Sequence, residues 1–336
     1  MKTKKISPSL KLWLAVFAFV PFFALNIFCG SLDIPATKVV EILFSSSAAN
    51  DAATYIILQS RLPQAIVAML CGASLSVAGL LLQTAFRNPL AGPSIFGITS
   101  GASLAVALVT LLLGGSATAL GFQLSIVVAA FVGASIVTAI VLALSSIVRS
   151  NTMLLIVGIM IGYIASSAIT LLNYFASEEG VRNYLLWGMG NFDDVSLQQL
   201  PLFTFLSLVG ILASLMLIKP LNTLLLGDRY AENLGINIRR VRNQLLIVTG
   251  LLTAVSTAYC GPVAFLGLAV PHIARLITNT ENQRQLLPAT ILCGAIVALL
   301  CNFLTTLPSN GTLLPLNAIT PLIGAPVIIY VVLLKR

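Results

Sequence analysis

Charged side chains are scarce in this chain of 336 residues: Asp, Glu, Lys and Arg together make up 8% of it, whereas a soluble domain has about 25%. Apolar residues make up 58%, and the mean hydropathy is +1.02. These values exclude an ordinary water-soluble fold, a disordered chain and a small disulfide-stabilised domain. The composition therefore predicts a polytopic membrane protein.

Residues for metal, redox or nucleotide chemistry are also few. The chain has one His, and its five Cys residues include no Cys-x-x-Cys pair. It contains no Gly-x-x-x-x-Gly-Lys-Ser/Thr phosphate loop. We therefore expect no metal site, no cofactor and no catalytic residue, and we interpret the cysteines as small buried side chains. An integral-membrane enzyme is disfavoured, because it would need a cluster of acids, His or Cys at one face.

Long runs without charge mark the membrane spans, because a charge at the bilayer centre costs about 2.5–3.5 kcal/mol on insertion scales. Their uninterrupted apolar character indicates helices rather than a barrel. The runs are 12–32, 62–86, 88–148, 150–177, 195–218, 243–274 and 285–334. Three of them split, at Gly114 to Gly121, at Gly261-Pro262 and at 307–311. The prediction is one all-α domain, 1–336, of ten spans, of which the eighth is short.

The charges between the runs predict the topology. With ten spans, both termini lie on one side of the membrane. That side receives most of the 18 Lys and Arg residues, and only Lys38, Arg61 and Arg182 fall on the other, while the acids divide the opposite way. The positive-inside rule therefore places both termini in the cytoplasm. We attribute the net charge of +8 to topology and expect no nucleic-acid partner, since basic and aromatic residues are not interleaved.

A loose repeat indicates internal symmetry. Gly92-Pro93-Ser94-Ile95-Phe96-Gly97 follows the second span, and Gly261-Pro262-Val263-Ala264-Phe265-Leu266-Gly267 follows the seventh. An offset of five spans gives the two copies opposite orientations. This predicts an inverted repeat of spans 2–5 and 7–10, an arrangement common in transporters.

No predicted span contains Asp or Glu, so the sequence shows no proton or sodium relay, and it shows no ATP site. An uphill transporter of this kind would need a partner that supplies energy. The densest polar segment between spans, 227–242, predicts a small helix on the cytoplasmic face, with Asp228 capping it, Gly235 ending it and Asn237 capping the next helix. A docking site for a motor subunit and a solvated loop are equally compatible with this spacing.

Several blocks of residues carry a family resemblance. They are Arg61-Leu62-Pro63 through Gly72-Ala73, Gly79 and Gln83 to Arg87-Asn88-Pro89-Leu90-Ala91-Gly92-Pro93 and Gly97; Asp228 to Arg242; Gly261 to Arg275, which includes Val270-Pro271-His272; Leu286-Leu287-Pro288-Ala289; and Gly324-Ala325-Pro326. Over about its whole length, the chain resembles the permease subunits of binding-protein-dependent ABC importers for iron-siderophores, haem and vitamin B12, the FecCD/BtuC type.

The resemblance implies a type II importer permease: a homodimer of ten-span subunits in the lipid of the bacterial inner membrane, with a path at the dimer axis. Two ATP-binding-cassette ATPase subunits would lie below it, and a periplasmic substrate-binding protein above it. ATP hydrolysis would take place on the ATPases, so the chain itself would be a transport subunit and no enzyme.

The resemblance also assigns roles to residues. Matches to the family's ATPase-coupling helices are Gly227, Asp228, Arg229, Ala231, Glu232, Leu234, Gly235 and Ile236. Asn88 and Leu90, with Asn151 and Thr152, match positions that close the cytoplasmic end of the path, and Trp187-Gly188-Met189-Gly190 matches an element near the periplasmic entrance. Arg61 matches a basic residue that docks the binding protein. Gln64 stands where a second arginine is common, and Thr306 stands near another, so docking through charge pairs is in question.

The sequence leaves the cargo open. The resemblance ranks an iron-siderophore first, then haem, then cobalamin. His272 invites comparison with a haem ligand, but a structural hydrogen-bonding role is the stronger interpretation. A secondary transporter driven by an ion gradient is the alternative from another class, and it would need an intramembrane carboxylate that the sequence lacks.

Overall fold

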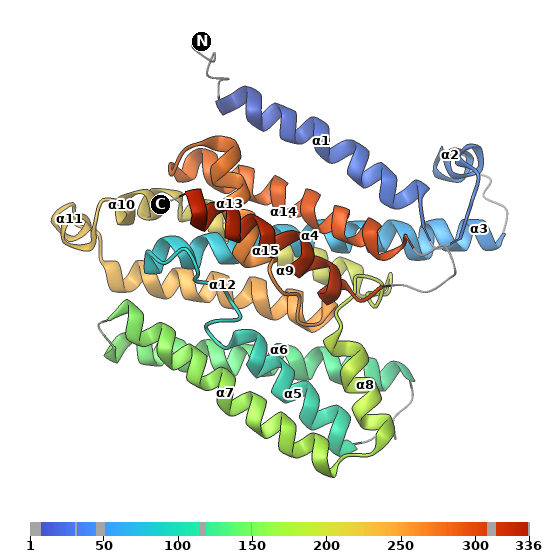
Figure 1. Cartoon of the computed structure of the whole chain (residues 1–336), viewed down its shortest axis with the longest axis horizontal. Coiled ribbons are helices and arrows are strands. Elements are labelled where there is room, and N and C mark those ends of the chain that lie inside the picture. Colours follow the sequence, from blue (N-terminus) through green and yellow to red (C-terminus); the bar gives the residue numbers. More distant parts are fainter. Residues whose placement is uncertain are drawn as a thin grey trace.

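The computed structural model describes residues 8–30, 32–44, 51–113, 119–148, 150–307 and 314–334, and every regular element in these ranges is helical (Figure 1). The spanning helices are α1 (Pro8–Phe28), α4 (Leu62–Phe86), α5 (Ile98–Leu113), α6 (Ala119–Ile147), α7 (Asn151–Phe175), α9 (Leu200–Met216), α12 (Ile238–Cys260), α13 (Leu266–Thr278), α14 (Gln283–Thr305) and α15 (Leu316–Leu334).

These helices match the ten predicted spans in order. Within the described ranges, five segments are long and apolar enough to cross a membrane, and α9 forms a sixth together with α10 (Ile218–Leu225), to which it is bent by 50°. Four shorter apolar helices lie within α1, α5, α13 and α15. The predicted break at Gly261-Pro262 separates α12 from α13, and Gly261 has the positive φ of 72° that favours glycine. The other two predicted breaks fall largely on residues outside the described ranges.

Short helices lie outside the spans, and the sequence predicted only one of them, α11 (Asp228–Asn233). The others are α2 (Ala36–Phe44), α3 (Ala52–Tyr55), the π-helical turn η1 (Ile56–Arg61), α8 (Glu178–Gly188) and α10. Figure 1 shows α2, α3 and α8 at one end of the molecule and α10 and α11 at the other. We name these the α8 end and the α11 end.

Helix α4 is the central element, and nearly all of its side chains are buried. It packs against α9, α12, α13 and α14. Glycines allow two of these contacts to be very close: a Cβ on Gly72 would lie 2.3 Å from the Gly294 carbonyl oxygen, and one on Gly79 would lie 1.6 Å from the Gly267 carbonyl oxygen. Between helices in lipid, where apolar burial gives little driving force, close packing of small residues supplies much of the attraction.

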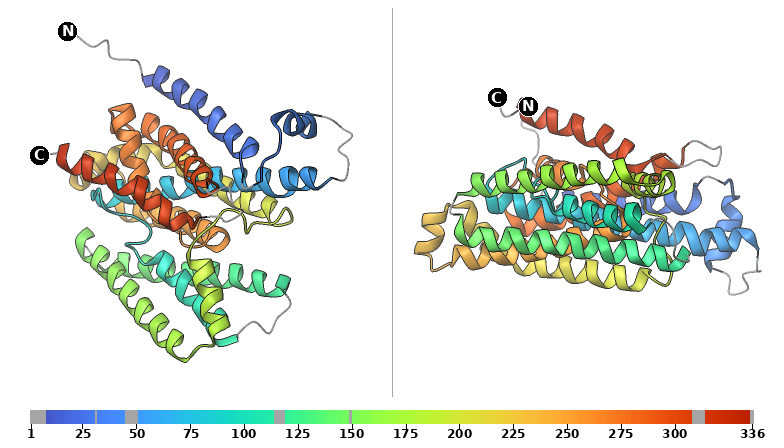
Figure 2. Two further views of the ribbon diagram at one scale, coloured as in Figure 1. Left: turned by 45° about the vertical axis from the view of Figure 1, so that its right-hand side comes forward. Right: turned by 90° about the horizontal axis from the view of Figure 1, so that it is seen from below.

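The contacts between helices follow the predicted inverted repeat. In the repeat, helices α4, α5, α6 and α7 correspond to α12, α13, α14 and α15. The contact of α4 with α14 then corresponds to the contact of α12 with α6. In the same way, the contact of α5 with α6 corresponds to that of α13 with α14. All four pairs are in contact, and so are α5 with α7 and α13 with α15. The α5–α8 bundle lies to one side of the remaining helices (Figure 2). It joins them mainly through α12, where Gly250 lies close to Thr138.

The two ends of the molecule differ in charge. Helix α1 begins and α15 ends at the α11 end (Figure 1), which agrees with an even number of spans. The same end carries Arg87, at the end of α4, and Arg239, near the start of α12, whereas Arg182 and the acids of α8 and its following loop lie at the α8 end. The charge asymmetry read from the sequence is therefore an asymmetry between two faces of the fold.

We predict that Gly79→Ala separates α4 from α13 and destabilises the protein by about 1–3 kcal/mol, the usual cost of overpacking, because the added methyl group would meet backbone rather than a movable side chain. Thermal unfolding in detergent measures the loss. Gly188→Ala is the matched control, since a Cβ there meets no atom within 4 Å. Equal melting temperatures for the two variants would contradict the assignment of Gly79 as a close-packing position.

Candidate functional site

The α11 end displays a short helix built on a small buried side. Ala231 is fully buried, and Ile236, just beyond the helix, packs on the core, whereas Tyr230 and Leu234 are 54% and 58% exposed. Helix α11 contacts α10 before it and α12 after it. An exposed aromatic and an exposed aliphatic side chain, placed on a helix that does not span the membrane, form a surface suited to a protein partner.

The ends of α11 correct one prediction and confirm two. Gly227, with a φ of 115°, occupies the N-cap position, so Asp228 is the first helical residue and not the cap. Gly235, with a φ of 80°, ends the helix as predicted, and the N–H of Ile236 returns to the Ala231 carbonyl. Asn237 caps α12 through a 2.9 Å bond that its Oδ1 accepts from the Arg240 amide. The side chains of Asp228 and Arg229 lie outside the described part of the structure.

Two turns near this end contain the predicted gate residues. Asn88 Oδ1 accepts a 2.9 Å bond from the Leu90 amide, which fixes the first turn, and leaves Leu90 48% exposed. Asn151 and Thr152 begin α7, whose N-cap Ser150 accepts a bond from the Met153 amide. The structure also joins the first turn to α13.

That joint to α13 is His272. Its side chain is 3% exposed, and Nε2 lies 2.9 Å from the Pro89 carbonyl oxygen. The ring therefore holds the first gate turn against α13. This placement supports the structural interpretation of His272 over a role as a haem ligand.

The two Gly-Pro segments of the inverted repeat meet inside the protein. A single cavity of about 220 Å³ beside Leu75 of α4 is lined by residues 92–95 of the first segment and by residues 263–265 and 267 of the second. Gly158 of α7 lies against the first segment, since a Cβ there would be 2.6 Å from the Ile95 carbonyl oxygen. Residues 92–95, which follow the first gate turn, therefore pack directly on α7, and the second gate turn lies at the start of that helix.

Helix α7 has an exposed face of changing character. Tyr163, Ser166, Ser167, Thr170 and Tyr174 are all exposed. Their spacing of one, three or four residues places them on one side of the helix. Closer to the α11 end, the same side carries the apolar residues Ile156 and Ile159, which are 49% and 40% exposed. A hydroxyl-bearing stripe on an otherwise apolar spanning helix is typical of a surface that faces a passage or another helix.

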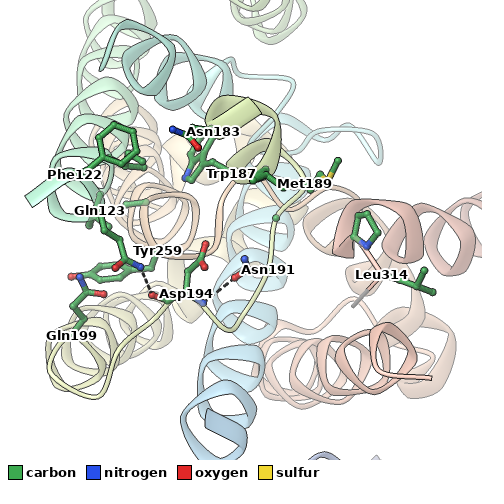
Figure 3. Close-up of a pocket in the computed structure, with 16 residues that line it drawn as sticks. Phe122, Gln123, Asn183, Trp187, Met189, Asn191, Asp194, Gln199, Tyr259 and Leu314 are labelled. Atoms are coloured by element: carbon green, nitrogen blue, oxygen red, sulfur yellow. Dashed lines mark hydrogen bonds between the residues drawn. The ribbon is translucent and has the colours of Figure 1, made fainter. Parts of the chain in front are cut away.

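The α8 end contains a cavity of about 430 Å³, shown in Figure 3. Its wall combines apolar residues with the polar side chains of Gln123, Asn183, Asn191, Asp194 and Gln199. Gln123 donates a 2.9 Å bond to the Asp194 carbonyl, and Asn191 accepts bonds from the amides of Asp193 and Asp194. Trp187, predicted to lie near an entrance, is a lining residue of this cavity.

The charges at the α8 end are mainly negative. Desolvation at the cavity wall raises the pKa of the Asp194 carboxyl, although the residue as a whole is exposed; a hydrogen bond from Asn191 opposes the rise, and the negative charge of Asp193 adds to it. Glu178 and Glu179 are exposed at the start of α8. Lys38 forms an ion pair with Asp51. The hydrogen bond and the positive charge of Lys38 hold the pKa of the Asp51 carboxyl below its ordinary value.

Arg61, the residue expected to dock a binding protein, is turned inward. Its side chain is 4% exposed and donates to the carbonyl groups of Ile27, Phe28 and Leu32, at distances of 3.0 and 3.1 Å for the first two. Gly30 leaves room for it, because a Cβ there would lie 2.7 Å from the guanidinium Nε. In this structure Arg61 binds the carbonyls at the end of α1, so its guanidinium offers no exposed charge to a partner.

Gln64, the other predicted docking position, takes part in a polar chain between helices. Its amide donates a 3.2 Å bond to Asn302 of α14, and Asn302 donates a 2.7 Å bond to Asn26 of α1. Asn26 and Asn302 are buried. The two residues expected to bind a partner therefore hold α1 to α4 and α14, a role that no local sequence pattern reveals because it depends on which helices become neighbours.

Comparison with known proteins identifies relatives along nearly the whole chain. The sequence profile of the FecCD transport family matches residues 17–334. The vitamin B12 import system permease protein BtuC of Serratia proteamaculans is 36% identical over 296 residues, which are 86% of this chain and 84% of that protein. The hemin transport system permease protein HmuU of Yersinia pestis is 32% identical over 308 residues, 91% of this chain and 92% of that protein.

A solved structure shares the fold. It is described as an inward-facing conformation of a metal-chelate type ABC transporter, and it superposes with a TM-score of 0.83 at 28% sequence identity. The match covers 97% of this chain and 99% of that one. The ten-helix architecture is thus that of a type II ABC importer permease.

We predict that Arg61→Ala lowers the stability of the protein by about 3 kcal/mol, because it leaves buried carbonyl groups without a donor. Arg61→Lys restores part of the loss, since one ammonium group replaces the forked guanidinium. Thermal unfolding in detergent gives both values, and Arg182→Ala, on the exposed side of α8, is the control. An unchanged melting temperature for Arg61→Ala would show that the residue has no such structural role.

Proposed function

We propose that this chain, which belongs to the FecCD transport family, is the importer permease that moves an iron-siderophore-type metal chelate inward across the bacterial inner membrane. A permease role in an ABC importer is common to its relatives. The single observation that supports the passage of a bulky cargo is the α7 face, which carries hydroxyl groups toward the α8 end and apolar residues toward the α11 end. Such a lining would hold a large chelate weakly and release it.

The passage needs a second wall, and a second copy of the chain would supply it. Within one chain, only 22% of an 18-residue apolar stretch of α7 is buried. The corresponding share for the span that contains α4 is 89%. A homodimer that pairs the exposed faces of α7 would cover the hydroxyl-bearing stripe and remove it from lipid. In this arrangement Asn88 and Leu90, with Asn151 and Thr152, would close the end of the passage next to α11.

The energy would come from two ATP-binding-cassette ATPase subunits at the α11 end. None of the ten spanning helices contains Asp or Glu, so the chain lacks the carboxylate that an ion-driven transporter would use. The exposed Tyr230 and Leu234 and the segment from Gly227 to Ile236 would form the ATPase contact. Helix α1 begins and α15 ends at that end, which the positive-inside rule assigns to the cytoplasm.

The α8 end would then face the periplasm and receive the substrate-binding protein. Since Arg61 is buried and Lys38 is paired, a binding protein would meet a surface rich in exposed acids there, with Arg182 beside them. Electrostatic attraction of a basic surface fits this face better than the acid-to-arginine pairing that the family resemblance implied.

Haem and cobalamin are the alternative cargoes, and the names of two relatives favour testing them in parallel. We expect proteoliposomes that contain the permease, its ATPase subunits and its binding protein to accumulate a ferric hydroxamate siderophore only with ATP inside. Haemin and cyanocobalamin are the comparison probes. Accumulation of one of these in place of the siderophore would replace the cargo assignment, and ATP-independent accumulation abolished by an uncoupler would overturn the importer assignment.

We predict that Glu232→Arg abolishes ATP-driven uptake, because it reverses an exposed charge in the middle of the ATPase contact. The variant should keep the wild-type melting temperature and lose co-purification with the ATPase. Glu41→Arg is the matched control for the melting temperature and for ATPase co-purification, as it makes the same charge reversal on an exposed position of α2 at the other end. Normal uptake by Glu232→Arg would contradict the placement of the contact.

A further inference from the structure

The coupling helix α11 reaches the rest of the protein through its two neighbours in the chain. It contacts α10 and α12, and most of its described side chains are exposed, with Ala231 buried. A displacement of α11 by a bound subunit is therefore transmitted by α10 on one side and by α12 on the other. The bonds that these two helices make at the α11 end decide which part of the permease moves with each.

Helix α10 is bonded to the first gate turn. The guanidinium of Arg87 donates a 2.9 Å bond to the Leu224 carbonyl in the last turn of α10. Arg87 has a left-handed φ of 46° at the end of α4 and directly precedes Asn88-Pro89-Leu90. A charged donor on a carbonyl at a helix C-terminus is a favourable pairing.

Helix α12 is bonded to the helix that leads into the second gate turn. The hydroxyl of Ser145 lies 3.2 Å from Oδ1 of Asn243, in the second turn of α12. Ser145 is buried at 6% exposure and lies in the last turn of α6, shortly before Ser150-Asn151-Thr152. The same hydroxyl also lies 2.7 Å from the Leu142 carbonyl oxygen in its own helix, so losing the contact with Asn243 removes the bond between the two helices and leaves the local one in place.

The two connections reach different gate turns. Arg242 of α12 also lies over the ring of Phe86 in α4, with 5.8 Å between the guanidinium carbon and the ring centre. That contact is weaker than a charge-assisted hydrogen bond. Helix α4 also packs along α10 and α12, and the bond of Arg87 adds to this packing a charge-assisted hydrogen bond at the residue before the first gate turn.

We propose that Arg87 and the Ser145–Asn243 pair are positioning residues that couple α11 to the two gate turns separately, Arg87 through α10 to Leu90 and Ser145–Asn243 through α12 to Thr152. This inference rests on the proposed function of the α11 end and deepens it. It means that the two gate turns can be disconnected one at a time by single substitutions that leave the ATPase contact unchanged.

The test follows each gate turn separately in the complete permease–ATPase complex in lipid nanodiscs. A thiol is introduced by Leu90→Cys or by Thr152→Cys, both exposed positions, in a Cys29→Ser background because Cys29 is the exposed native cysteine among the described residues. The rate of modification by a water-soluble maleimide is measured without nucleotide and with ATP and vanadate. Co-purification of the ATPase reports an intact contact.

We expect Arg87→Gln to reduce the ATP-dependent change at Leu90→Cys by about tenfold, the size set by a hydrogen bond to a charged group, and to leave the change at Thr152→Cys intact. Ser145→Ala should reduce the change at Thr152→Cys by about threefold, as for a neutral hydrogen bond, and leave that at Leu90→Cys intact. Arg87→Lys and Ser145→Thr should restore part of each response, because they keep the charge and the hydroxyl.

Two variants make the same chemical changes without these bonds. Arg240→Gln removes an exposed arginine of α12, and Ser135→Ala removes a hydroxyl of α6 that bonds the Phe131 carbonyl in its own helix. Both should respond like the wild type. Wild-type responses at both thiols in Arg87→Gln and Ser145→Ala, or equal losses at both thiols in each, would overturn the separate coupling. Absence of any ATP-dependent change in the wild-type complex would instead overturn the proposed function.

Discussion

Helix α4 lies at the centre of this protein, and it touches its neighbours at distances that only glycine allows. Gly72 faces Gly294 of α14, and Gly79 faces Gly267 of α13. In lipid, helices gain little from burying apolar surface, so the closeness of this packing and the few buried hydrogen bonds have to hold the bundle together. The buried amides of Asn26 and Asn302 and the guanidinium of Arg61 add specific bonds where α1 joins this centre. The turns at 88–90 and 150–152 lie at one end of this packed centre.

The helices around α4 divide into a well-buried set and a more exposed bundle. The inverted repeat is visible in the contacts of both, because equivalent helices meet equivalent neighbours. The two Gly-Pro segments line one cavity between the halves. Helices α6 and α7 remain largely uncovered within a single chain. Charge then distinguishes the ends, with arginines at the α11 end and acids at the α8 end.

Much of the fold could be predicted from the sequence because the bilayer imposes simple rules. Charge-free runs of sufficient length located the spans, Gly261-Pro262 marked the break between α12 and α13, and Asn237 marked the start of α12. The short helices α2, α3, η1 and α8 were not predicted, since they lie outside the spans and lack a long apolar run. Asp228 was assigned as a cap because Asp commonly caps helices, but the neighbouring Gly227 occupies that position.

The sequence by itself determined the membrane class, the ten spans, the inverted repeat and the opposite charge of the two ends, because hydropathy and charge act locally along the chain. Only the tertiary structure decided what individual polar residues do. Arg61 is a basic residue at a helix start in the sequence, yet in the fold it binds the end of α1, more than 30 residues away in the chain. Ser145 and Asn243 are separated by 98 residues and become partners only because α6 packs on α12. The physical reason is that a buried polar group takes its role from its neighbours in space, and no local pattern records them.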